Sequence, residues 1–91
     1  MLTVDSIPSY SASAIGRVLD KEAVVVVPAR GKVNVLNEVG ARVWSLCDGK
    51  HTIRAIAAVI CREYAVDEAQ AEEDVLEFVQ DLVTRGMLVV A

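Results

Sequence analysis

The chain has 91 residues, of which 54% are hydrophobic and 24% are charged, and its formal net charge is −4. These values describe one globular domain and exclude disordered and collagen-like chains. No apolar run approaches the roughly 18 residues needed to span a bilayer. The N-terminal residues also lack the basic start and apolar centre of a secretory signal, so we expect a cytosolic protein without a membrane partner.

The first half of the chain predicts a short N-terminal arm and a three-stranded sheet. Residues 1–13 contain Pro8 and four serines without apolar periodicity, which favours a flexible arm ahead of one folded domain over residues 14–91. Three β-prone stretches follow at 15–19, 22–27 and 32–36. The short links between them predict an antiparallel meander with residues 32–36 at an edge.

The second half predicts three helices, each with a capping residue in front of it. Asn37 precedes a helix that ends near Asp48, Thr52 precedes a second helix, and Asp67 precedes a third that ends at Gly86. Apolar residues recur at helical spacing in each segment. The β-prone residues 87–90 then form a short strand or cover the core. The expected fold class is α+β, with a three-stranded meander followed by three helices in a winged-helix-like order.

The residue types that usually carry catalysis or bind metals are sparse. Cys47 and Cys61 lie apart without a CxxC motif, and we expect two buried, inert thiols. His51 is the single histidine and lies in a predicted turn. We therefore expect neither an enzyme nor a metal or cofactor. Trp44 is expected in the core, although tryptophan is also common in binding hot spots.

One run of residues gives the sequence a family resemblance. The segment Leu36-Asn37-Glu38-Val39-Gly40-Ala41-Arg42-Val43-Trp44 strongly resembles the PqqD family. The resemblance extends over roughly residues 15–90, and its further matches are Asp48-Gly49, Thr52-Ile53, Ile56-Ala57, Tyr64 to Asp67, Asp74-Val75, Phe78-Val79, Leu82 and Gly86-Met87-Leu88.

This resemblance implies a non-catalytic peptide chaperone. PqqD-like domains bind the leader of a ribosomally made precursor peptide and present it to a radical S-adenosylmethionine enzyme or another modifying enzyme. In the family, the leader adds a strand to the third strand and lies between that strand and the third helix. Carried onto this sequence, the peptide-binding residues are Lys32, Val33, Asn34, Val35, Leu36, Glu72, Val75, Leu76 and Val79.

The residues support the same site independently, and they leave alternatives open. An uncovered edge strand is a natural template for β-augmentation, and it could equally pair with its own copy in a homodimer. The pathway could be pyrroloquinoline quinone synthesis or another peptide modification, such as that of lasso peptides. The winged-helix order suggests DNA binding as a distant alternative. Seven acids against one base in residues 67–91 argue against nucleic acid as a partner.

Overall fold

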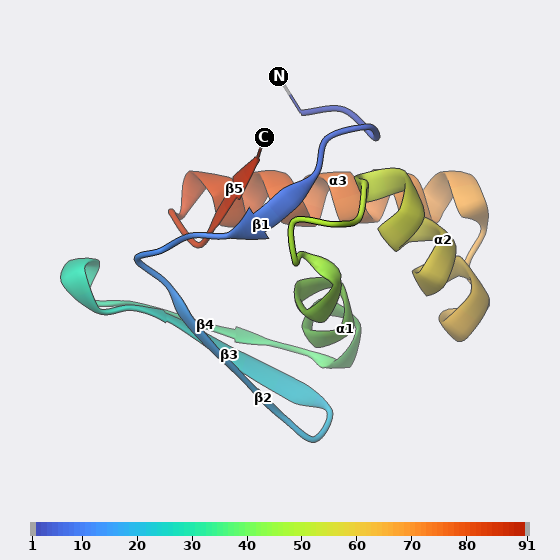
Figure 1. The fold of residues 1–91 in the computed structure, drawn as a ribbon. Coiled ribbons are helices and arrows are strands. Elements are labelled where there is room, and N and C mark those ends of the chain that lie inside the picture. Colours follow the sequence, from blue (N-terminus) through green and yellow to red (C-terminus); the bar gives the residue numbers. More distant parts are fainter. Residues whose placement is uncertain (1, 91) are drawn as a thin grey trace.

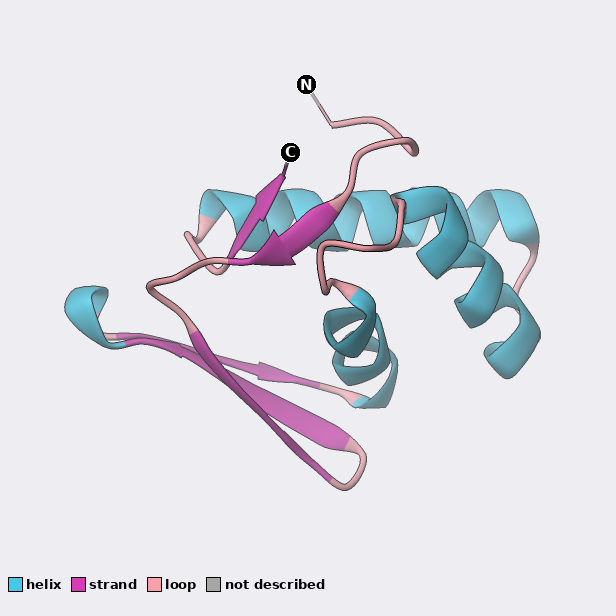
Figure 2. Cartoon of the chain, viewed as in Figure 1, coloured by secondary structure: helices cyan, strands magenta, loops and turns pink. Residues whose placement is uncertain are grey.

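Two small sheets and three helices make up the fold in a computed structural model that describes residues 2–90 (Figures 1 and 2). In chain order the elements are β1 (Pro8–Tyr10), β2 (Ile15–Leu19), β3 (Glu22–Val27), the 3-10 turn η1 (Pro28–Arg30), β4 (Lys32–Leu36), α1 (Glu38–Leu46), α2 (Ile53–Tyr64), α3 (Glu68–Thr84) and β5 (Leu88–Val90).

The expected meander is confirmed as an antiparallel sheet in the order β2-β3-β4. Its register pairs Gly16 with Val25, and Val25 with Asn34. Because side chains alternate along a strand, Ala23, Val25 and Val27 all point to the same face, where they are fully buried under the helices. At the turn between β3 and β4, Gly31 adopts φ 61°, as a left-handed closing residue requires.

The three predicted caps start the three helices. The Asn37 side chain accepts a hydrogen bond from the Gly40 amide at 2.9 Å, and Thr52 accepts one from the Ala55 amide at 3.0 Å. Asp67 accepts from the Gln70 amide at 3.3 Å. Each bond satisfies a backbone donor that the first turn of a helix leaves unpaired. None of these helices, within the part of the chain that is described, is long and apolar enough to cross a membrane.

One apolar core joins the sheet to the helices. Trp44 of α1 is 5% exposed, as expected from the sequence, and its indole lies against β2 at Gly16. Ile53 and Ile56 on α2 are completely buried, and each such side chain contributes about 1.5–3 kcal/mol through burial. The α3 helix runs across the back of this core and packs mainly against α2 and β5.

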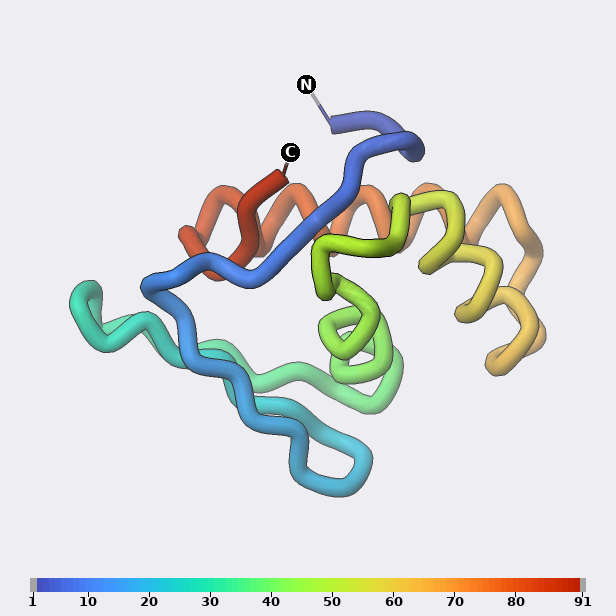
Figure 3. The backbone as a smooth tube through the Cα atoms, in the orientation of Figure 1, coloured from blue at the N-terminus to red at the C-terminus, as the bar shows by residue number. Residues whose placement is uncertain are grey.

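The N-terminal segment differs from the flexible arm that the sequence predicts. Pro8–Tyr10 forms strand β1, which pairs antiparallel with β5 so that Pro8 lies opposite Val90 (Figure 3). The carbonyl oxygens of Val4 and Ser6 also accept hydrogen bonds from the first amides of α2. Pro8 is buried, so this segment closes one side of the core. The physical reason is a pairing between chain ends, which local composition does not encode.

Candidate functional site

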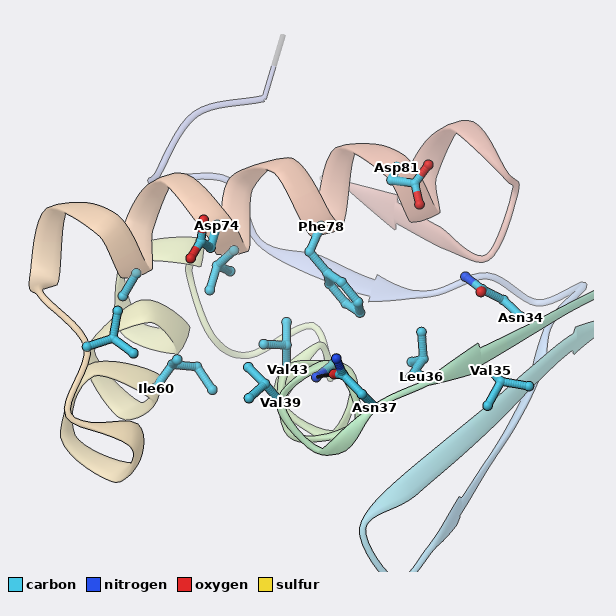
Figure 4. A pocket seen from close by; sticks show the side chains of 14 residues that line it. Asn34, Val35, Leu36, Asn37, Val39, Val43, Ile60, Asp74, Phe78 and Asp81 are labelled. Atoms are coloured by element: carbon cyan, nitrogen blue, oxygen red, sulfur yellow. Dashed lines mark hydrogen bonds between the residues drawn. The ribbon is translucent and has the colours of Figure 1, made fainter.

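A groove of about 470 Å³ lies between β4 and α3, with α1 and α2 beneath it (Figure 4). Its walls are mostly apolar and its rim carries two carboxylates. The lining residues are Asn34, Val35, Leu36, Asn37, Val39, Gly40, Val43, Ile60, Val66, Ala71, Asp74, Val75, Phe78 and Asp81.

Strand β4 gives the groove a wall with an unpaired backbone. Its register with β3 turns Asn34 and Leu36 toward the helices and turns Val35 to the opposite face, as Figure 4 shows. Among the described strands β4 pairs with β3 alone, so its other edge has no strand partner. An edge of this kind presents N–H and C=O groups that an extended peptide can use.

Phe78 forms the centre of the helical wall. It is half-buried, and its ring points from α3 across the groove toward Leu36 and Asn37 (Figure 4). A Cβ atom added to Gly40 would lie 3.2 Å from Cε1 of Phe78 and 3.3 Å from Cβ of Leu36. The glycine therefore permits a close approach between α1, the end of β4 and the aromatic ring, and this approach sets the depth of the groove.

The charged residues along this groove are both acidic. Asp74 accepts a hydrogen bond from the Gln70 side-chain amide at 2.8 Å, which leaves its charge uncompensated. Asp81 is different, because Nε of Arg85 donates to both of its carboxylate oxygens at 3.1 Å. The rim is therefore most negative beside Asp74, which favours a ligand with a cationic group near that end.

The structure separates the predicted binding residues into two groups. Asn34, Val35, Leu36 and Val75 line the groove, and Lys32 and Val33 lie on the same strand outside the lining. The remaining three residues, Glu72, Leu76 and Val79, lie on α3 but do not line the groove. Val79 is completely buried in the core, and Leu76 is half-buried on another flank of the helix.

Several lining residues were not among those expected from the sequence. They are Asn37, Val39, Gly40, Val43, Ile60, Val66, Ala71, Asp74, Phe78 and Asp81. Residues 71, 74, 75 and 78 of α3 lie on a single helical face. Their spacing in the sequence was therefore the signal that could have identified this wall of the groove. The neighbouring face at 75, 79 and 82 is equally apolar, so periodicity alone does not identify which face contacts the core.

The cysteines and the histidine lie outside the groove. Burial raises the pKa of the Cys47 thiol to about 12, with a smaller contribution from the nearby Asp48 carboxylate. His51 lies in the turn after α1, where its Nδ1 is 2.9 Å from Asp48. Within residues 2–90, no cluster of three His, Cys, Asp or Glu side chains has a geometry suited to a metal ion.

A match to a family model shows which protein family the chain is related to. The model of the family "Coenzyme PQQ synthesis protein D (PqqD)" matches residues 22–88. The chain belongs to the PqqD family. Two curated relatives are the PqqA binding proteins of Rhodopseudomonas palustris strains HaA2 and CGA009, which are 31% and 32% identical over 63 residues. The match covers 69% of this PqqD-family chain and 62% of each relative.

Solved structures share the fold over almost the whole chain. TbiB1 in complex with the TbiA(beta) leader peptide is 30% identical, with a TM-score of 0.81 over 88% of this chain and 93% of TbiB1. The solution structure of the PqqD truncation of Methylobacterium extorquens PqqCD is 22% identical, with a TM-score of 0.79 over 98% of this chain and 95% of that one. These likenesses confirm the α+β fold expected from the sequence.

Proposed function

We propose that this protein binds the leader of a ribosomally made precursor peptide and presents it to a modifying enzyme, without catalysing the modification itself. The observation that carries the proposal is an apolar groove beside the unpaired edge of β4. The relatives named PqqA binding proteins favour pyrroloquinoline quinone synthesis, in which the partner would be a radical S-adenosylmethionine enzyme. The likeness to TbiB1 in complex with the TbiA(beta) leader peptide supports a second candidate, the leader of a peptide-modification pathway other than pyrroloquinoline quinone synthesis.

The backbone and the groove would contribute different parts of the binding energy. A leader added as a strand beside β4 would form backbone hydrogen bonds, each with a net contribution of about 0.5–1.5 kcal/mol and little dependence on sequence. Alternate leader side chains would then enter the groove between Leu36 and Phe78. The groove is therefore the part that selects an apolar or aromatic residue of the leader.

The first test compares two apolar residues of α3 that are both half-buried. Phe78 lines the groove and Leu76 does not, so Leu76→Ala is a matched control for Phe78→Ala. We expect Phe78→Ala to weaken leader binding by about 2 kcal/mol, or roughly 30-fold, as for an aromatic anchor at an interface. Leu76→Ala should cost stability and leave the affinity within about threefold of the wild type.

The measurement is calorimetric titration with two synthetic probes, PqqA of Rhodopseudomonas palustris HaA2 and the TbiA(beta) leader. Tighter binding of one probe assigns the pathway class. Should both variants bind the preferred probe equally well, the groove beside Phe78 is not the site. If the wild-type protein binds neither probe at high micromolar concentration, the client belongs to a third kind of pathway.

Proline scanning of β4 tests the backbone contribution. In an edge strand, successive N–H groups point alternately toward the paired strand and away from it. Proline at Val33 or Val35 should therefore remove N–H groups that point to one side of β4, and proline at Asn34 should remove an N–H group that points to the other side. The class that loses a bond to β3 should destabilise the protein, whereas the class that loses an outward donor should stay folded and bind the leader less tightly. Equal leader affinity in all the folded proline variants would exclude strand addition at β4.

A further inference from the structure

The sheet has an outer face that no described helix covers. The register of β2, β3 and β4 places eight side chains on it in three rows. These eight residues, called the outer face below, are Ile15, Arg17, Leu19, Glu22, Val24, Val26, Val33 and Val35.

The outer face is unusually apolar for a surface in contact with water. Ile15, Val33 and Val35 are each 62–63% exposed, and Leu19 is 55% exposed. Val24 and Val26 lie between them and are partly exposed. Scattered exposed apolar residues are ordinary, but a contiguous patch of this kind marks an interaction site. The patch lies mainly on the side of β4 opposite to the groove, and Val35 is the one residue that belongs to both the outer face and the groove lining.

The two charges on the outer face are arranged around Val24. Arg17 is the cross-strand neighbour of Val24 on β2, and Glu22 lies two residues before Val24 on β3. Neither side chain forms an ion pair with any residue of the described chain. In ideal strand geometry, the Cα atom of Arg17 therefore lies about 4.8 Å from that of Val24 across the strands, and the Cα atom of Glu22 lies about 6.8 Å from it along the strand. The two directions are perpendicular.

We propose that the outer face binds the outer face of a second copy of this chain, with the strands of the two sheets crossing at about 90°. The two-fold axis of this dimer lies between the two sheets, passes over Val24 and runs at about 45° to the strands. Rotation about this axis turns the direction across the strands of one copy into the direction along the strands of the other. It therefore brings Arg17 of each copy over Glu22 of the other. The same rotation stacks Val24, Leu19 and Val33 on their own counterparts. The interface is isologous, as a closed dimer requires.

The size of the outer face determines how strong this dimer can be. Two strand spacings by four residues span about 10 Å by 14 Å, which places the buried area below the roughly 1,200 Å² of a standard interface. The dimer is therefore weak and reversible, with a dissociation constant in the micromolar range or above. It also differs from pairing through the β4 edge, because it uses side chains and leaves the edge backbone free.

Sedimentation equilibrium of the whole protein from about 10 µM to 1 mM, at low ionic strength, tests the proposal. We expect a concentration-dependent monomer–dimer equilibrium. Arg17→Glu and Glu22→Arg should each weaken it at least tenfold, because like charges then face each other. Combining the two substitutions restores both pairs and should return the constant to within about threefold of the wild type. Arg62→Glu and Glu73→Arg, at exposed positions on α2 and α3, are the matched controls.

Three other results would contradict the proposal. A protein that stays monomeric at 1 mM does not use its outer face to bind a second copy. A dimer that is indifferent to both single substitutions forms elsewhere, for example through the β4 edge. Failure of the double substitution to restore association would disprove the pairing of Arg17 with Glu22. Circular dichroism of each variant establishes that these exposed substitutions leave the fold intact.

Discussion

Substitution of Gly16 by alanine tests how the sheet is fixed to the helices. A Cβ atom at Gly16 would lie 2.5 Å from Cζ2 and Nε1 of Trp44 and 2.6 Å from Cε2, closer than nonbonded atoms approach. The indole has little room to move, because its ring centroid is 4.7 Å from that of Tyr10 and it is 5% exposed. Tyr10 also donates a hydrogen bond from its hydroxyl to the Trp44 carbonyl at 2.8 Å.

Two opposing effects determine how much Gly16→Ala changes the free energy of unfolding. Alanine in place of glycine inside a strand ordinarily stabilises a protein by about 0.5–1 kcal/mol. Overpacking a well-packed core costs about 1–3 kcal/mol, and contact with three atoms of a confined ring places this case in the upper part of that range. We therefore expect Gly16→Ala to lower the free energy of unfolding by about 1–2 kcal/mol. For a domain of this size the midpoint of thermal unfolding should fall by roughly 4–16 °C.

Thermal unfolding followed by circular dichroism and by Trp44 fluorescence measures this change. The double variant Gly16→Ala/Trp44→Leu is the control, since removing the indole removes the clash. It should be no less stable than Trp44→Leu alone. An unchanged or raised midpoint in Gly16→Ala would refute the reasoning, because the ordinary gain from alanine would then outweigh the contact with Trp44.

Three further predictions concern the thiols, one ion pair and nucleic acid. Cys47 is buried as expected from the sequence, whereas Cys61 is partly exposed and departs from that expectation. In the native protein Cys47 should therefore stay unmodified by a thiol reagent at neutral pH while Cys61 reacts, as mass spectrometry of the labelled protein would show. Nε and Nη2 of Arg42 donate to Glu63 at 2.9 Å, and these hydrogen bonds lower the pKa of that carboxyl. A lowered pKa stabilises the fold at pH values above the ordinary pKa of glutamate. The wild type should therefore have a higher free energy of unfolding than Glu63→Gln near neutral pH, and this difference should disappear as the pH falls through the lowered pKa. A difference that grows in acid would contradict this prediction. Duplex DNA at physiological ionic strength should bind no tighter than the non-specific range of roughly 10⁻⁴ M, and a micromolar complex would revive the winged-helix alternative.

The parts of the fold that depend on local sequence were predictable. A run of four β-branched valines favours β3, and the caps Asn37, Thr52 and Asp67 mark helix starts through bonds within three residues. The pairing of β1 with β5 has no comparable local signal. It joins Pro8 to Val90 across almost the entire chain, and proline is tolerated there because β1 is an edge strand.

The candidate site was predictable to a different extent on its two sides. The β4 edge followed from the order of three short strands and from alternation, both of which are local. The helical wall depends on how α3 is rotated about its axis. Phe78 and Val79 are adjacent in sequence but about 100° apart around the helix, so the rotation of α3 decides which of them lines the groove and which is buried in the core. The packing of α3 against α2 and β5 sets that rotation, and neither contact is visible in the sequence of α3.

Strand β4 offers three sets of atoms for three contacts. Leu36 and Asn34 point toward the groove, Val33 and Val35 belong to the outer face, and the edge backbone lies between them. Because the groove lining and the outer face share Val35 alone, leader binding and pairing of two copies use largely different surfaces. Arg17→Glu should therefore weaken self-association without changing leader affinity, and Phe78→Ala should do the reverse. If either substitution changed both affinities equally, the two contacts would share more surface than Val35, which contradicts the alternation of side chains along β4.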